Sequence, residues 1–299
     1  MYHVCWILFI VIFLLWFLFR VLVALSVSFN STNTLYCHDS PCTSTPIPQY
    51  HRLNTRIDTF RQFNVRYAYQ CIQWINNLYN NESVSPDFIR IADLFLSDHK
   101  LFGCIEQSIE HPNEIYIIFR GTMNVQDVVK DSSVHQTPFL DYPTTISTHK
   151  GFSSVYTQIR DQIFSVIQTL QPTHVLWSGH SLGAAIALLG LFDQHTHFPE
   201  IVTVAYLFAC PRVGNITFST KIPSESCFRI VNTEDVVNEL PLSITIRPFN
   251  PYHPFIYQHA GRVYSFSDNR KSLLLNHSID TYAANLSSLV LHNKAVQLL

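Results

Sequence analysis

A serine flanked by glycines, in Gly179-His180-Ser181-Leu182-Gly183, has the residue types and spacing of a nucleophile. Residues 175–177 before it favour a buried strand, and the alanine- and leucine-rich segment from Ala184 favours a helix. Glycines two residues to either side of the serine allow the backbone to reverse sharply between strand and helix. The motif predicts that Ser181 lies at the amino end of a helix, where backbone N–H groups can stabilise an oxyanion.

A serine hydroxyl is a weak nucleophile near neutral pH, and it needs a histidine to take its proton and an acid to orient that histidine. After a turn of this kind, the acid precedes the histidine along the chain. Two acids, Glu234 and Asp235, follow a predicted strand at residues 228–231. The histidines downstream of them are His253, His259, His277 and His292. Chain order alone therefore leaves both the acid and the base open.

Alternating strands and helices predict the frame that positions these residues. We expect strands over residues 101–105, 114–120, 175–177, 201–209, 228–231 and 261–266, and helices over 56–80, 152–170 and 276–292. Such alternation is typical of a mainly parallel α/β sheet flanked by helices. Ligands of such sheets bind beyond the carboxyl ends of the strands, where Thr122, Ser181 and Asp235 all fall.

The composition excludes some classes of function. Hydrophobic residues make up 47% of the 299 residues and charged residues 13%, against about 25% charged in typical soluble domains. Such a surface fits contact with lipid. The net charge is -2 and there is no basic run, so nucleic-acid binding is not expected. No cysteine or histidine spacing is typical of a zinc site, and we expect neither a metal nor an organic cofactor.

The first 29 residues predict a targeting segment. Residues 4–19 are an unbroken apolar run, which is longer than the roughly 7–15 residues of a signal-peptide core. The run approaches the about 20 residues of a membrane span only when Arg20 is included. We expect residues 1–29 to be a signal anchor or a signal peptide, 30–55 a stalk or surface segment, and 56–299 the catalytic domain. A signal anchor and a signal peptide would both place the catalytic domain in the secretory pathway, facing the lumen or the exterior.

Two other features fit the secretory route. Five Asn-x-Ser/Thr sequons are present, at Asn30, Asn81, Asn215, Asn276 and Asn285, and we expect only some of them to carry glycans. Six cysteines lie outside the apolar run, namely Cys37, Cys42, Cys71, Cys104, Cys210 and Cys227. The first two are close enough in sequence to close a small disulfide loop, and the other four are bridges or buried thiols.

From about residue 56 to residue 290 the chain resembles the class 3, fungal-type lipases. The similarity is carried by the serine motif together with Phe119-Arg120-Gly121-Thr122, His149-x-Gly151-Phe152, Pro211-Arg212-Val213-Gly214-Asn215, and Arg229-Ile230-Val231-Asn232 leading to Asp235-Val236-Val237 and Leu240-Pro241. This resemblance implies the α/β-hydrolase fold and a Ser-His-Asp catalytic triad.

The resemblance also implies a role for each residue. Ser181 is the nucleophile, Asp235 the acid and His277 the base. Thr122 and the backbone N–H of Leu182 form the oxyanion hole. We therefore expect a Thr122→Val variant to lose activity without unfolding.

Other positions follow from the same resemblance. The segment from Met123 to Asp131 resembles a lid, and Asp131 at its far end holds the side chain of Thr122. His180 is similar to a structural histidine beside the nucleophile, and His259 to a histidine that is not the base. Ala209 stands where the family commonly has glycine.

These residues predict a serine-dependent carboxylic-ester hydrolase that acts on lipids through an acyl-enzyme. A phospholipase, another esterase, or a transferase or thioesterase of the same fold is an alternative. A membrane-tethered binding protein without activity is another, although the complete set of catalytic groups argues against it. The partner is a lipid or ester substrate, at a membrane or lipid interface, and no protein partner is predicted. Because Asn276-His277-Ser278 is a sequon that contains the proposed base, we expect Asn276 to be unmodified.

Overall fold

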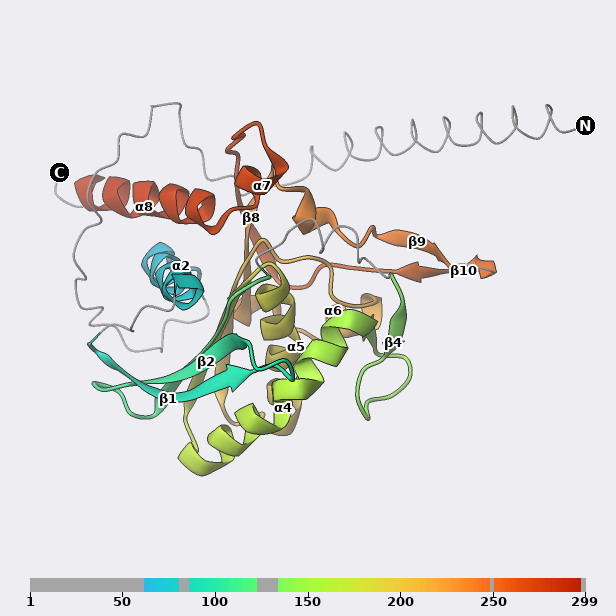
Figure 1. The fold of residues 1–299 in the computed structure, drawn as a ribbon, viewed down its shortest axis with the longest axis horizontal. Coiled ribbons are helices and arrows are strands. Elements are labelled where there is room, and N and C mark those ends of the chain that lie inside the picture. The colour runs from blue at the N-terminus through green and yellow to red at the C-terminus, as the bar shows by residue number, and fades with distance from the viewer. Residues whose placement is uncertain (1–61, 81–85, 123–133, 248–249, 297–299) are drawn as a thin grey trace, which may run out of the picture. The chain divides into compact units, whose positions relative to one another are not determined.

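The computed structural model describes residues 62–80, 86–122, 134–247 and 250–296, and its centre is a seven-stranded sheet (Figure 1). The strand order is β1-β2-β3-β6-β7-β8-β11. Five strands pair in parallel: β3 (Glu114–Phe119), β6 (His174–His180), β7 (Val202–Phe208), β8 (Cys227–Asn232) and β11 (Arg262–Phe266). At one edge, β1 (Phe88–Phe95) and β2 (Leu101–Ser108) are antiparallel. The predicted mainly parallel α/β sheet is confirmed.

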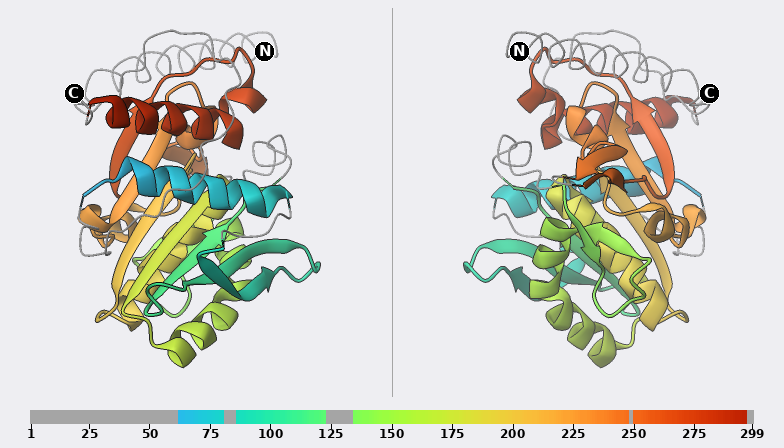
Figure 2. Two further views of the ribbon diagram at one scale, coloured as in Figure 1. Left: turned by 90° about the vertical axis from the view of Figure 1, so that its left-hand side faces the viewer. Right: turned by 90° about the vertical axis from the view of Figure 1, so that its right-hand side faces the viewer.

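Helices cover both faces of this sheet (Figures 1 and 2). One face carries α2 (Val65–Asn80) and α8 (Ile279–Val296), and the other carries α4 (Lys150–Leu170) and α5 (Leu182–His197). Successive side chains of a strand point to opposite faces, so β3 contributes Ile115, Ile117 and Phe119 to the core under α4 and α5, and Tyr116 and Ile118 to the core under α2. The central strands are therefore mostly apolar, because they are buried on both sides.

Short elements complete the fold. They are β4 (Gln136–Pro138) with β5 (Ser147–His149), β9 (Ile244–Arg247) with β10 (Asn250–Ile256), the helices α6 (Ile216–Thr220) and α7 (Leu273–Asn276), and the 3-10 helices η2 (Ser224–Ser226) and η3 (Val236–Glu239). Three strand-to-helix connections, after β6, β8 and β11, form the candidate site described below.

Two predicted helices were wrong at their amino ends. The first was predicted from residue 56 but begins at Val65, because the Asn64 side chain accepts hydrogen bonds from the N–H groups of Arg66 (2.9 Å) and Tyr67 (3.4 Å) and caps the helix. The last was predicted as one helix from Asn276. Instead, the chain turns at His277 between α7 and α8.

Several predictions fall outside the described residues. The apolar segment 1–29, the segment 30–55 with Cys37 and Cys42, and most of the lid-like stretch are among them. Within the described ranges, no helix combines the length and apolarity that a membrane crossing requires. The other four cysteines are buried free thiols. Burial raises the pKa of Cys71 and of Cys227 to about 12, which keeps these thiols protonated and unreactive.

Candidate active site

The turn after β6 holds Ser181 in a strained conformation at the start of α5. Its φ is 57° and its ψ is -121°, outside the regions that residues other than glycine usually adopt. A Cβ atom on Gly179 would lie 2.3 Å from the carbonyl carbon of Gly183, and one on Gly183 would lie 2.5 Å from the carbonyl oxygen of Arg120. No real Cβ contact is this short, so both glycines of the motif are required for β6, α5 and the end of β3 to approach each other.

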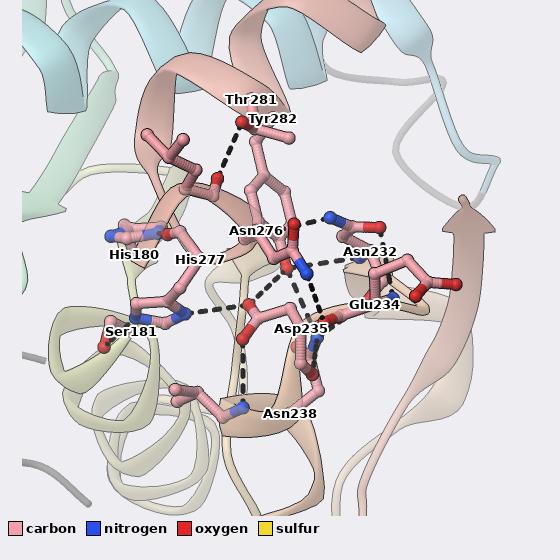
Figure 3. A network of polar contacts seen from close by, with 12 residues as sticks. His180, Ser181, Asn232, Glu234, Asp235, Asn238, Asn276, His277, Thr281 and Tyr282 are labelled. Atoms are coloured by element: carbon pink, nitrogen blue, oxygen red, sulfur yellow. Dashed lines mark hydrogen bonds and ion pairs between the residues drawn. The ribbon is translucent and has the colours of Figure 1, made fainter. Parts of the chain in front are cut away.

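Ser181, His277 and Asp235 form a continuous hydrogen-bonded chain (Figure 3). The Oγ of Ser181 lies 2.8 Å from Nε2 of His277, and Nδ1 of His277 lies 2.8 Å from Oδ2 of Asp235. All three residues are at most 2% exposed. An ionised carboxylate can only accept, so Nδ1 donates to Asp235 and Nε2 accepts from the serine hydroxyl. This arrangement can transfer the serine proton to His277 while Asp235 stabilises the imidazolium that forms.

Of the two acids that chain order left open, only Asp235 contacts the histidine. Its Oδ2 also accepts from the Tyr282 hydroxyl at 2.8 Å, and its Oδ1 accepts from the N–H of Val237 at 2.9 Å. The Glu234 side chain points away from His277 (Figure 3). Its oxygens contact Ser267 and Asn269 instead. Three donors thus fix a fully buried carboxylate, as burial of a charge requires.

Of the histidines that chain order left open, one contacts Ser181. His277 contacts the nucleophile, whereas His259 has covered ring nitrogens that make no hydrogen bond within the part of the chain that the structure describes. The side chains of His253 and His292 lie outside the described residues. His277 is thus the histidine that the fold brings to Ser181.

Buried polar side chains that sequence reasoning missed lock the acid-bearing loop to the histidine-bearing loop. The Tyr282 hydroxyl, besides donating to Asp235, accepts from the N–H of Asn232 (3.1 Å) and from Nδ2 of Asn238 (3.2 Å). Nδ2 of Asn232 donates to the carbonyls of Asp268 (2.9 Å) and Asn276 (3.0 Å). The sequence signal for these residues is weak, because an asparagine in a connection is most often a turn residue.

The sequon that overlaps the site has its asparagine inside this network. Asn276 is 5% exposed. Its Nδ2 donates to the carbonyl of Glu234 (3.0 Å) and its Oδ1 accepts from the N–H of Arg270 (2.7 Å). A glycan on Nδ2 has no room in this packing, which supports our expectation that Asn276 is unmodified.

The two expected oxyanion donors lie beside the nucleophile. Thr122 follows the end of β3, which pairs in parallel with β6 so that Phe119 is opposite Gly179. A Cβ atom on Gly121 would lie 3.1 Å from Cβ of Ser181, so the end of β3 passes directly beside the nucleophile. Leu182 is the first residue of α5, where backbone N–H groups have no intrahelical partner. Asp131, at the end of the lid-like segment, lies outside the described residues.

The second histidine of the motif, His180, is fully buried between Tyr79 and His277. Its Nε2 lies 3.0 Å from the carbonyl oxygen of His277 and its Nδ1 lies 3.1 Å from the Tyr79 hydroxyl. Burial, and to a lesser extent the neighbouring His277, lower the pKa of His180 well below its ordinary value of 6.5. His180 is therefore neutral near neutral pH and does not compete with His277 for the serine proton.

The buried imidazoles predict that the protein loses stability in acid. Burial lowers the pKa of both His180 and His259 well below 6.5. Below that pH the unfolded chain binds more protons than the folded protein. The free energy of unfolding therefore falls, by up to about 1.4 kcal/mol per pH unit for each histidine, until the pH reaches the lowered folded-state pKa.

Urea denaturation between about pH 8 and about pH 5 measures this loss. We expect His259→Gln to weaken the pH dependence and His99→Asn, at an exposed position with positive φ, to leave it unchanged. A free energy of unfolding that stays constant over this range would contradict the burial of both imidazoles in neutral form.

A mainly parallel sheet, a strained serine at a strand-to-helix turn, and a histidine and acid from later connections define a protein of the α/β-hydrolase fold. A sequence model of the family described as lipase (class 3) matches residues 116–244. Over these residues, which include Ser181 and Asp235, the chain is similar to the class 3 lipases.

Individual lipases are also similar to this chain. A lipase from Rhizopus niveus is 36% identical over 141 residues, which is 42% of this chain and 34% of the relative. The secreted mono- and diacylglycerol lipase MDL3 from Malassezia globosa is 31% identical over 180 residues, which is 53% of this chain and 55% of the relative. The chain thus spans between a third and somewhat over half of the length of these curated relatives. The solved structure of lipase II from Rhizopus niveus superposes with a TM-score of 0.57 at 25% identity, covering 68% of this chain and 80% of that one.

Proposed function

We propose that this protein is a serine-dependent carboxylic-ester hydrolase that acts on lipids. The observation that carries the proposal is the hydrogen-bonded chain from the Ser181 hydroxyl through His277 to Asp235. These three groups are the set that acyl transfer requires, and they come from three separate connections at the carboxyl ends of the sheet.

The geometry supports the following sequence of steps. Ser181 attacks the acyl carbonyl while His277 accepts its proton at Nε2, and the tetrahedral oxyanion lies between Thr122 and the N–H of Leu182. His277 then returns the proton to the leaving alcohol, which gives the acyl-enzyme. A water molecule attacks the acyl-enzyme with His277 again as base, and release of the acid restores Ser181.

A lipid substrate is supported by the apolar surface beside the triad. Leu273, Leu274 and Leu275, which are separated from His277 by Asn276 alone, are between 49% and 62% exposed. Val236, next to Asp235, is 43% exposed. Consecutive exposed leucines are costly in water, and they mark a surface that contacts apolar chains. The relatives from Rhizopus niveus and Malassezia globosa, a lipase and a mono- and diacylglycerol lipase, agree with this substrate class.

Hydrolysis of a soluble short-chain ester and of emulsified mono-, di- and triacylglycerols, measured side by side, tests the proposal. We expect activity on the acylglycerols, with a preference for long acyl chains. Hydrolysis confined to soluble short-chain esters would replace the lipase with a general esterase, and cleavage of phospholipid vesicles alone would replace it with a phospholipase. A folded protein that is inactive on all of these substrates would contradict the proposal.

We also propose that residues 56–299 form the hydrolase domain, with 1–29 as a signal anchor or signal peptide and 30–55 as a stalk or surface segment. The apolar run supports entry into the secretory pathway, and the relative MDL3 is described as secreted. Membrane attachment through residues 1–29 and glycans on some of the sequons belong to the same proposal.

The Thr122→Val variant tests the proposed oxyanion hole. Loss of one oxyanion donor typically lowers kcat by about 10²–10³-fold. We expect a loss at the lower end of that range with little change in melting temperature, because Thr122 is exposed. Steady-state kinetics on a soluble ester and thermal melting check the two expectations, with Thr122→Ser as the variant that keeps the hydroxyl. Full activity of Thr122→Val would remove the side chain from the mechanism.

A further inference from the structure

We propose that Tyr79 is a positioning residue of the hydrolase site. Its hydroxyl connects the strand end that leads to the oxyanion donor with the loop that carries the base. This inference rests on the proposed function for its kinetic consequences, and on three hydrogen bonds for its structural basis. Nothing in the serine motif or its partners points to this residue, which lies at the end of α2, far from them in sequence.

The contacts form one continuous chain. The N–H of Gly121 donates to the Tyr79 hydroxyl at 2.7 Å. That hydroxyl lies 3.1 Å from Nδ1 of His180. Nε2 of His180 lies 3.0 Å from the carbonyl oxygen of His277. The chain therefore runs from the residue before Thr122 to the backbone of the proposed base.

The direction of each hydrogen bond follows from its ends. A carbonyl can only accept, so His180 carries its proton on Nε2 and donates it to His277. The ring is neutral, so Nδ1 is an acceptor and takes the proton of the Tyr79 hydroxyl. The phenol oxygen then accepts from Gly121. Every polar group in the chain is satisfied, and successive hydrogen bonds of the same direction reinforce one another.

Burial keeps this direction fixed over the working pH range. It lowers the pKa of His180 well below 6.5 and raises the pKa of Tyr79 to about 12. Neither group therefore changes its protonation state near neutral pH.

The hydroxyl of Tyr79 also occupies a tightly limited space. A Cβ atom on Gly121 would lie 2.5 Å from this hydroxyl, 2.9 Å from the carbonyl oxygen of His180 and 3.1 Å from Cβ of Ser181. Gly121 is thus enclosed between the tyrosine hydroxyl and the nucleophile turn. The hydroxyl sets how closely the end of β3 approaches Ser181, and hence where Thr122 lies.

Removal of the hydroxyl would leave two polar groups without a partner, the N–H of Gly121 and Nδ1 of His180. A buried polar group without a partner destabilises the folded structure, and the local structure relaxes to recover part of this cost. We expect the relaxation to displace the end of β3 and the backbone of His277. Because misplacement of catalytic groups by about 1 Å can cost about 10²-fold in rate, the effect appears in kcat and leaves KM nearly unchanged.

Tyr79→Phe tests the inference, and Tyr69→Phe is the matched control. Tyr69 lies on the same helix, and its hydroxyl makes no hydrogen bond among the described residues. On a soluble ester we expect kcat of Tyr79→Phe to fall by about 10- to 100-fold, with KM within about a factor of two, and Tyr69→Phe to behave as the wild type.

A double-mutant cycle with Thr122→Val tests whether Tyr79 affects kcat through the position of Thr122. If Tyr79 acts through the position of the oxyanion donor, the loss caused by Tyr79→Phe is smaller in the Thr122→Val background than in the wild type. Fully additive losses, or an active wild type whose Tyr79→Phe variant keeps its kcat, would overturn the inference and leave the proposed function standing.

Nitrogen NMR of the histidine side chains tests the structural chain without any activity. We expect the wild type to show His180 as the Nε2–H tautomer with a hydrogen-bonded Nδ1, and Tyr79→Phe, but not Tyr69→Phe, to shift the Nδ1 signal. An unchanged signal would overturn the inference even if the protein proved inactive, so its failure is distinct from failure of the proposed function.

Discussion

Replacement of Ser181 by alanine is expected to lower kcat for ester hydrolysis by about 10⁶-fold, the size of loss seen when the nucleophile of a serine triad is removed. The variant keeps His277, Asp235 and the expected oxyanion donors but has no atom that can form the acyl-enzyme. We expect the melting temperature to change little, because among the described residues the Ser181 side chain has a single side-chain partner, His277. Initial rates on a soluble ester measure the effect.

Ser178→Ala is the matched control for that variant. Ser178 lies on the same strand and is buried, but its hydroxyl donates to the carbonyl of Tyr206 at 2.7 Å rather than contacting the site. We expect it to lower stability by about 1 kcal/mol and to leave kcat unchanged. Hydrolysis by Ser181→Ala at more than a small fraction of the wild-type rate would show that another group is the nucleophile.

Asp235→Asn is expected to lower kcat by about 10⁴-fold while leaving the fold intact. Asp235 accepts a hydrogen bond from Nδ1 of His277. An asparagine amide can present its N–H₂ group instead, which favours the histidine tautomer with the proton on Nε2. That tautomer cannot accept the proton of Ser181, so the nucleophile is no longer activated.

Glu234→Gln separates this effect from a general loss of negative charge. The two acids are adjacent in sequence, but the Glu234 side chain contacts Ser267 and Asn269 outside the triad. We expect Glu234→Gln to retain activity close to that of the wild type. Equal losses in both variants, measured as kcat at neutral pH, would contradict the assignment of Asp235 as the acid.

The serine turn could be predicted from the sequence because its determinants are local. The apolar strand, the glycines at positions 179 and 183 and the helix that follows are contiguous, and each has a steric reason that the structure makes explicit. The central strands were predictable for a similar reason, since burial on both faces gives them continuous apolar runs.

The rest of the site could not be derived from the residues alone. His277 lies 96 positions from Ser181 and 42 from Asp235, and local patterns carry no information about contacts at such separations. The choice of Asp235 over Glu234, and of His277 over the other histidines, came from the family resemblance. The role of Tyr79 was not predicted, because its partner His180 is 101 positions away. The residues around Tyr79 in the sequence show only the apolar stripe of a helix.

Errors at element boundaries have physical causes of the same kind. The cap at Asn64 and the break at His277 are set by specific side chains within apolar patterns that continue past them. The edge strand β1 was not predicted because its half-buried residues alternate irregularly, and its pairing with β2 contains two register shifts.

The central claim is that Ser181 is an activated nucleophile. Labelling of the native protein with a fluorophosphonate, followed by mass spectrometry of its peptides, tests this claim most directly, because the reagent reacts only with a serine whose hydroxyl is deprotonated by a neighbouring base. We predict one modified residue, Ser181, with labelling lost in Ser181→Ala and strongly slowed in Asp235→Asn. A folded protein that remains unlabelled, or one labelled at a different serine, would contradict the account.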